Sequence, residues 1–118
     1  MTNAPLLLNK SNKHDENPVY RDSLMIDGIG DAYSEKPMGI TAENVADKYQ
    51  VTRQDMDEFA RDSHAKAYAA QENNWFEEEY TPVKLNEKVL DHDETIRPDT
   101  SLDALGQLKP VFKENGRV

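Results

Sequence analysis

Apolar residues recur every three or four positions in two segments near the middle of the chain, which is the spacing of one face of a helix. In the first segment the repeating residues are Ala42, Val45, Ala46 and Tyr49. Thr41 precedes them as a candidate N-cap, and Glu43 would lie in the first turn, where the helix dipole favours a carboxylate. This pattern predicts a short helix that begins directly after Thr41.

The second segment predicts a longer helix. Thr52 is its candidate N-cap, and Asp55 stands three residues on, at the spacing of a capping box. A stripe of helical period follows, made of Met56, Phe59, Ala60, Ser63, Ala67 and Ala70. The stripe changes from large to small side chains, so another element could approach its second half closely. Asn73 and Asn74 are predicted to end the helix, because Asn tolerates the left-handed conformation common at C-caps.

Shorter patterns flank these two helices. Residues 21–28 are expected to form a short helical or extended piece that a glycine ends. Residues 80–85 alternate as a strand does, and Pro82 would keep that strand at an edge. Residues 88–90 are its expected partner. The predicted fold class is therefore α+β, mainly helical, with short strands or a hairpin.

The end of the chain carries one more helix pattern and a hairpin signal. Asp99 or Thr100 is expected to cap a last short helix that carries Leu102, Leu105 and Leu108. Asn115 and Gly116 form the strongest short hairpin signal, yet only two residues follow them. We therefore expect the chain to be a piece cut from a longer protein.

Composition limits how much core the chain can build alone. Its 118 residues suffice for one modest domain, but Leu, Ile, Val and Phe make up only 23 of them and the net charge is −9. The acidic balance argues against nucleic acid and anionic membrane surfaces as partners, because both reward clustered Lys and Arg. Since no apolar run approaches the roughly 20 residues of a membrane span, a soluble, cytoplasmic protein is expected.

Metal and thiol chemistry find little support in the sequence. There is no cysteine, which excludes a disulfide, a thiolate metal site or a cysteine nucleophile among these residues. Residues 91–94 (DHDE) are hard metal ligands, but Ile96 and Leu102 stand where a calcium loop needs glycine and glutamate. A solvated acidic loop is the favoured interpretation, and a metal-dependent catalyst is a rival. His64 has no second histidine four residues away, so a surface histidine is expected.

A candidate anion site lies near the last predicted helix. Arg97 stands just ahead of the helix start, and three more basic residues follow, Lys109, Lys113 and Arg117. A helix N-terminus beside an arginine can hold a phosphate. The alternative is a salt bridge between Arg97 and Asp99 at the helix start.

Several stretches, in this order, resemble the thiolase family. They are MTNAPLLL at the start, MGITAENVADKYQVTRQDMDEFARDSHAKAYAAQ at 38–71, EEEYTPV at 77–83 and RPDTSLDALGQLKPVFKENGRV at 97–118. Within the family the resemblance is strongest to acetyl-CoA acetyltransferases. It implies that residues 1–118 form the lid, or loop domain, inserted in the N-terminal half of a larger αβαβα fold. The lid would comprise an extended and loop segment at 1–37, a helical core at 38–76, and short strands with a final helix at 77–118.

The resemblance implies a function for the parent protein. A thiolase lid covers the active site and holds much of coenzyme A, in an acetyl-CoA C-acetyltransferase that condenses two acetyl-CoA or thiolyses acetoacetyl-CoA. The family's nucleophilic cysteine, activating histidine and second cysteine lie outside the lid, so the chain alone is expected to be inactive. The alternative is a stand-alone, non-catalytic binding or assembly module derived from a lid.

The resemblance also implies which residues contact coenzyme A. Ile29 would pack on the cofactor, Met38 would lie beside the pantetheine arm and acyl group, and Arg97 would lie near the adenine and phosphate end. Ala104 and Phe112 would line the nucleotide and pantetheine sides. Coenzyme A and acetyl-CoA are then substrates, and no covalent cofactor, metal or catalytic residue is expected in this chain.

Two departures from the family pattern and one loop bear on specificity and assembly. Pro37 stands where many acetyl-CoA thiolases have histidine, and Ala104 stands where a serine is common, so two polar contacts are lost. Residues 9–17 are wholly polar and fall where tetrameric thiolases place a hairpin that joins dimers. The implied partners are coenzyme A thioesters and the remaining thiolase domains, in a homotetramer or dimer.

Overall fold

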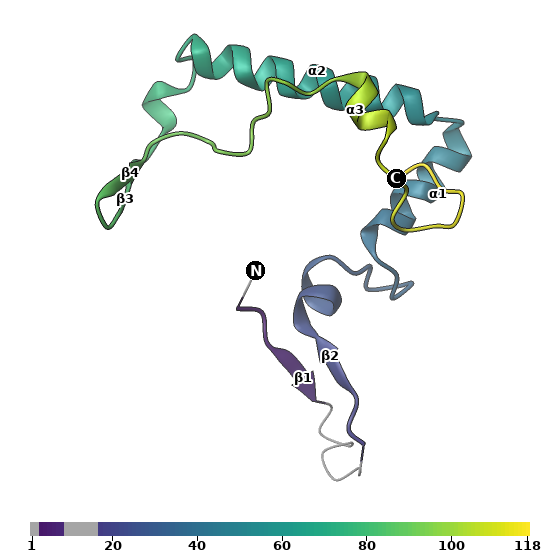
Figure 1. Ribbon diagram of the computed structural model, residues 1–118. Coiled ribbons are helices and arrows are strands. Elements are labelled where there is room, and N and C mark those ends of the chain that lie inside the picture. The colour runs from purple at the N-terminus through teal and green to yellow at the C-terminus, as the bar shows by residue number, and fades with distance from the viewer. Residues whose placement is uncertain (1–2, 9–16) are drawn as a thin grey trace. The chain divides into compact units, whose positions relative to one another are not determined.

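The computed structural model describes residues 3–8 and 17–118, which fall into two compact units (Figure 1). The first unit consists of Met1–Val51 and Pro110–Val118, and the second consists of Thr52–Lys109. The architecture is α+β, with short antiparallel strand pairs and helices. The predicted division of a lid into 1–37, 38–76 and 77–118 stays a prediction.

The first unit opens with a two-stranded hairpin and a helical turn. Strand β1 (Leu6–Leu8) pairs antiparallel with β2 (Tyr20–Asp22), and a π-helical turn, η2 (Leu24–Gly28), follows. The Asp22 side chain accepts a hydrogen bond from the Leu24 amide at 2.8 Å, which links strand to turn. The piece predicted at 21–28 is thus extended at its start and helical afterwards. The hairpin role proposed for residues 9–17 falls almost wholly outside the described residues.

Helix α1 (Met38–Tyr49) begins earlier than the sequence predicted. Its N-cap is Pro37, which makes no side-chain cap bond, so the prediction of a Thr41 cap is wrong. The Met38 amide donates to the Ile29 carbonyl at 2.9 Å. An N-terminal donor is therefore satisfied by the backbone of the preceding loop and needs no hydroxyl. The helix ends at Gln50, whose φ of 55° is left-handed.

The buried face of α1 also differs from the predicted one. The buried residues are Gly39, Glu43 and Ala46, whereas Val45 and Tyr49 are 48% and 66% exposed. The sequence analysis predicted the buried face from the positions of apolar side chains alone. The observed face is set by the Pro110–Val118 segment, which contacts Gly39 and Glu43.

Helix α2 (Arg53–Glu72) confirms the predicted start and end of the second unit's main helix. Thr52 and Asp55 form the expected capping box: the Thr52 hydroxyl accepts from the Asp55 amide, and the Asp55 carboxylate accepts from the Thr52 amide at 2.8 Å. At the other end Asn73 is the C-cap, and Asn74 has the left-handed φ of 53°. The capping box and the asparagines at the helix end each involve residues only a few positions apart, so both can be recognised in the sequence.

Helix α3 (Leu102–Gly106) packs on α2, and Figure 1 shows it beside that helix. The Arg53 guanidinium ties the two together by donating to the Leu105 carbonyl at 2.6 Å. The N-cap is Ser101 and not Asp99 or Thr100, because the Ser101 hydroxyl reaches the Ala104 amide at 3.2 Å. Leu108, predicted on this helix, lies beyond its end and is 60% exposed.

The strand pair predicted after α2 is confirmed. Following a short 3-10 turn, η3 (Glu77–Glu79), strand β3 (Val83–Leu85) pairs antiparallel with β4 (Lys88–Leu90). Asn86 takes a left-handed φ of 54° in the turn between them. Within residues 3–8 and 17–118, none of the helices combines the length and apolar content that a bilayer crossing requires.

The two threonines that the sequence offered as caps provide a matched test. Thr52→Ala is expected to cost about 0.5–2 kcal/mol of unfolding free energy, because an orphan amide of α2 loses its acceptor. Thr41→Ala should change stability little, since Thr41 is exposed within α1 and does not cap it. Urea unfolding of both variants measures this, and equal losses would contradict the assignment.

Candidate functional site

Three of the five predicted contact residues come together in the first unit. Ile29 and Met38 are joined by the backbone hydrogen bond at the start of α1. The Phe112 ring lies directly on Gly39, where a β-carbon would overlap the ring. Phe112 is therefore held beside the first turn of α1, next in space to the residue that follows Met38. Met38 is 63% exposed and Phe112 is 40% exposed, so both leave apolar surface uncovered.

The other two predicted residues lie at the start of α3 in the second unit. The Arg97 carbonyl accepts from the Thr100 hydroxyl at 2.8 Å, and the Arg97 amide donates to Nδ1 of His64 at 3.2 Å. His64 is thus half-buried and has a partner that the sequence did not indicate. Ala104 follows Ser101 on the exposed side of this helix start.

The Arg97 guanidinium is exposed and makes no ion pair with the described residues, so the alternative of an Arg97–Asp99 salt bridge is not formed there. Two of the three basic residues that follow it in the sequence have an acidic partner of their own. Lys113 and Arg117 both pair with Asp47 in the first unit, at 2.7 and 3.3 Å. Arg97 keeps its donors available for an anion.

The Pro110–Val118 segment forms a closed loop against α1. The Val111 amide donates to the Val118 carbonyl at 2.9 Å, and the Gly116 amide donates to the Lys113 carbonyl at 2.9 Å. Asn115 supplies a left-handed φ of 55° in the turn that the Gly116–Lys113 hydrogen bond closes, but Gly116 has no positive φ, so the Asn-Gly pair does not form the hairpin turn that its sequence signals. Phe112 stands within this loop, which makes the loop part of the site.

Glu43 is the residue of this region that sequence reasoning misread. Its side chain is 1% exposed, and its Oε1 accepts from the amides of Arg117 and Val118 at 2.7 and 2.8 Å. The sequence placed it in a favourable first turn. The available signal was the spacing of Gly39, Glu43 and Ala46, a glutamate between two small residues on one helical face.

The pKa of Asp47 is set by its two basic partners on the Pro110–Val118 loop. Hydrogen bonding and attraction by Lys113, with a smaller effect of Arg117, lower the pKa of Asp47 below its ordinary 3.8. A lowered pKa means that the interaction stabilises the fold above that ordinary value and is lost as the pH falls through the folded-state pKa. We expect Lys113→Met to raise the Asp47 pKa toward 3.8, measured by carboxyl ¹³C titration. An unchanged midpoint would show that Lys113 does not set it.

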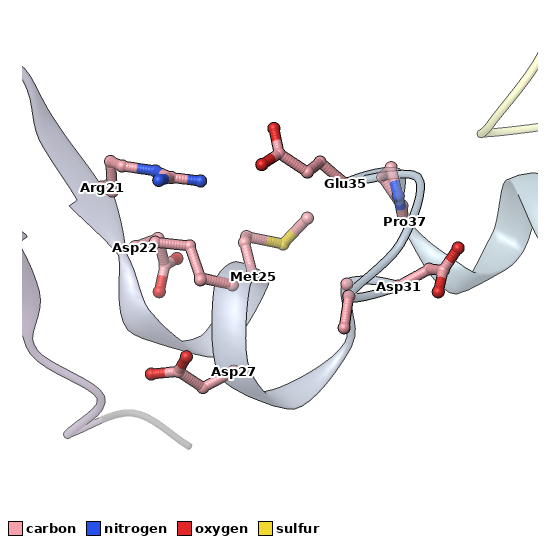
Figure 2. A pocket seen from close by; sticks show the side chains of 10 residues that line it. Arg21, Asp22, Met25, Asp27, Asp31, Glu35 and Pro37 are labelled. Atoms are coloured by element: carbon pink, nitrogen blue, oxygen red, sulfur yellow. The ribbon is translucent and has the colours of Figure 1, made fainter.

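A hollow of about 610 Å³ lies between β2, η2 and the loop before α1 (Figure 2). Apolar residues contribute to its lining, but the charged residues there are mainly acidic, with Arg21 as the basic member; the acids are Asp22, Asp27, Asp31 and Glu35. The Ser34 hydroxyl and the amides of Tyr33 and Ser34 lower the pKa of Asp31 and keep it charged. This charge disfavours a phosphate-bearing ligand here.

The acidic segment at 91–94 gains no support as a metal centre. His92 Nδ1 contacts Asp91 Oδ1 at 2.7 Å, and this contact lowers the pKa of Asp91. Across residues 3–8 and 17–118, no three His, Asp or Glu side chains gather as metal ligands would.

Comparison with known proteins identifies the family. The family described as "Thiolase, N-terminal domain" matches residues 1–118. The chain belongs to the thiolase family. It is 39% identical to a probable acetyl-CoA acyltransferase of Staphylococcus epidermidis, over all of this chain and 32% of that protein. It is 43% identical to an acetyl-CoA acetyltransferase of Pseudomonas aeruginosa, over 82% of this chain and 26% of that protein.

Solved thiolase structures match as well. Human mitochondrial 3-ketoacyl-CoA thiolase in complex with CoA superposes with a TM-score of 0.86 at 32% identity, over 98% of this chain and 30% of that one. The acetyl-CoA acetyltransferase from Syntrophomonas wolfei gives 0.87 at 34% identity, over 99% and 30%. The thiolase chain described here spans about a third of the length of these relatives. The family predicted from the sequence is confirmed.

Proposed function

We propose that this chain is the lid, the coenzyme A-binding portion, of an acetyl-CoA C-acetyltransferase. The reaction of the whole protein would be condensation of two acetyl-CoA to acetoacetyl-CoA, or the reverse thiolysis. The observation that carries the proposal is the match of 98% of the chain to 30% of a thiolase solved with CoA. The relatives named acetyl-CoA acetyltransferase support acetyl as the acyl group that is transferred.

The chain's own part in this reaction is binding. Without cysteine, it cannot supply the thiolate on which an acyl group is carried, so catalytic groups would come from the rest of the protein. Met38 and Phe112 offer exposed apolar surface for a pantetheine arm, and Ile29 is joined to Met38 through the backbone. A flexible thioester arm gains affinity mainly by such burial, which also excludes water from the thioester.

Arg97 is the residue proposed to bind the phosphate end of coenzyme A. Its guanidinium makes no ion pair with the described residues, so binding an anion breaks nothing. One charge-assisted hydrogen bond contributes about 1.5–3 kcal/mol. Since most burial would come from the catalytic domains, we expect this chain alone to bind coenzyme A only at about millimolar concentration, or −4 kcal/mol.

Two positions are proposed to shape specificity. Pro37 caps α1 and has no side-chain donor, and Ala104 has no hydroxyl on the exposed start of α3. At both places a ligand would meet apolar surface where a polar contact is common in acetyl-CoA thiolases. Acyl selection would then depend on shape more than on hydrogen bonding at these positions.

Large apolar side chains left uncovered support association with further thiolase domains. Among the described residues, the fully buried hydrophobic side chains are Ala46 and Ala70, while Phe59, Val111 and Trp75 are 78%, 80% and 68% exposed. Such surface favours a protein partner. The homotetramer or dimer of the parent stays a prediction.

A chimera tests the proposal. Residues 1–118 would replace the matching segment of the Syntrophomonas wolfei acetyl-CoA acetyltransferase, where the solved structure fixes the two junctions. We expect measurable thiolysis of acetoacetyl-CoA by the chimera and none by the chain alone. A folded, oligomeric chimera that neither binds coenzyme A nor turns over would refute the proposed function.

A further inference from the structure

A buried carboxylate needs an explanation, because removing its charge from water is costly unless hydrogen bonds replace the lost hydration. Glu43 is 1% exposed. Its hydrogen bonds with the described residues converge on one oxygen, Oε1, and both donors are backbone amides at the C-terminal end of the sequence, Arg117 and Val118. The nearby cation does not neutralise it, since the Arg117 guanidinium contacts Asp47 and the Val51 carbonyl.

The remaining attachments of the Pro110–Val118 loop to α1 are weaker. The Lys113–Asp47 pair is about half exposed on both sides, at 48% and 47%, and exposed ion pairs of this kind contribute little. Gly116 packs so closely on Glu43 that a β-carbon would overlap Oε1. Glu43 is therefore the main point at which the loop is fixed to the helix.

The fixed point is connected to Phe112 by one further hydrogen bond. The Val118 amide is held by Glu43, and the Val118 carbonyl in turn accepts from the Val111 amide at 2.9 Å. Phe112 is the next residue, and its ring lies on Gly39. Holding Val118 thus fixes the backbone from which the Phe112 ring projects onto the first turn of α1.

We propose that Glu43 is a positioning residue, whose carboxylate fixes the Pro110–Val118 loop on α1 and so places Phe112 beside Met38 as one apolar surface for the thioester arm. This inference rests on the proposed function for its ligand. It assigns to Glu43 a role in the shape of the binding surface, through Phe112 and without contact to the ligand. Loss of Glu43 should therefore weaken ligand contacts in the first unit and leave those of the second unit unchanged.

Two substitutions of Glu43 in the full 118-residue chain separate the loss of its hydrogen-bond acceptor from the loss of its negative charge. Glu43→Met keeps the side-chain length and removes the acceptor, whereas Glu43→Gln keeps one amide oxygen in the place of Oε1. Glu35→Gln is the matched control, because Glu35 is exposed in the same unit. The structural readouts are amide hydrogen exchange at Arg117 and Val118 and the ring-current shift that Phe112 imposes on the Gly39 α-protons.

In Glu43→Met we expect exchange at Arg117 and Val118 to quicken at least about tenfold, since two donors lose their acceptor, and the Gly39 ring-current shift to disappear. Glu43→Gln should restore most of both signals, and Glu35→Gln should change neither. In a coenzyme A titration, Glu43→Met should raise the Kd about fivefold and reduce the limiting shift of the Met38 signal, while the limiting shift of the Arg97 signal should stay unchanged.

The same measurements can overturn the positioning role of Glu43. Unchanged exchange and an unchanged Gly39 shift in Glu43→Met would overturn it, as would wild-type amides of Arg117 and Val118 that exchange at unfolded-chain rates. If Glu43→Met does not fold, Glu43→Gln decides: partly faster exchange at these two amides with intact α1 signals supports the role, and no change overturns it. If wild-type signals ignore coenzyme A while the Glu43 effects stand, the proposed function fails and the positioning of Phe112 does not.

Discussion

Replacing Gly116 with alanine is expected to destabilise the first unit by about 2–4 kcal/mol. The added β-carbon would overlap Oε1 of Glu43 and approach the Lys113 carbonyl to 2.9 Å. Neither group can retreat easily, because Glu43 is held by two amides and the Lys113 carbonyl accepts from Gly116 itself. The loop must therefore move off α1, which leaves a buried carboxylate with fewer partners.

Gly106 provides the control for this substitution. No atom lies within 4 Å of a β-carbon built at Gly106, and it belongs to α3, so Gly106→Ala should be neutral or stabilising by about 0.5–1 kcal/mol. Neither glycine has a positive φ, so backbone strain does not separate the two. Denaturant unfolding measures the difference, followed by the α1 signals for Gly116→Ala and by the α2 signals for Gly106→Ala. Similar small effects of both substitutions would contradict the close packing at Gly116.

Arg97→Met is expected to raise the KM for coenzyme A about 10- to 100-fold in the thiolase chimera, with kcat little changed. The estimate follows from losing one charge-assisted hydrogen bond of about 1.5–3 kcal/mol. A contact far from the reacting thioester stabilises the ground state and the transition state alike, so its loss appears in KM. Arg97→Lys should recover only part of the loss, because lysine lacks the guanidinium fork.

Arg61→Met is the matched control, because it removes one positive charge from the same unit. Arg61 pairs with its neighbour Asp62 at 2.7 Å on α2, so its charge, unlike that of Arg97, already has an acidic partner. Steady-state kinetics of both variants measure the comparison. An equal rise in KM for both would mean that overall charge, and not a contact at Arg97, sets the affinity.

The parts of the fold that the sequence predicted correctly are those set by local contacts. The capping box of Thr52 and Asp55 spans three residues, and the left-handed Asn74 follows directly after the helix it ends. The β3–β4 hairpin likewise joins strands close in the chain. In each case the interacting groups lie within a few positions, so residue types at a fixed spacing carry the information.

The error with the largest consequence arose where distant segments meet. Glu43 was taken for a helix-start residue, yet its partners lie 74 and 75 positions away. That contact decides which face of α1 is buried, so the predicted face failed with it. The candidate site shows the same contrast between local and long-range information. The family resemblance indicated five contact residues: Ile29, Met38, Arg97, Ala104 and Phe112. No local pattern could indicate that a buried glutamate holds Phe112 in place.

The coenzyme A-binding surface proposed for this thiolase chain can be tested by ¹⁵N–¹H correlation spectra of residues 1–118 during a coenzyme A titration. We predict dispersed peaks, with shifts concentrated at Ile29, Met38, Arg97, Ala104 and Phe112 and a midpoint of about 1 mM. Peaks at these residues that do not move at coenzyme A concentrations about tenfold higher, or shifts confined to the acidic hollow around Asp31, would contradict it.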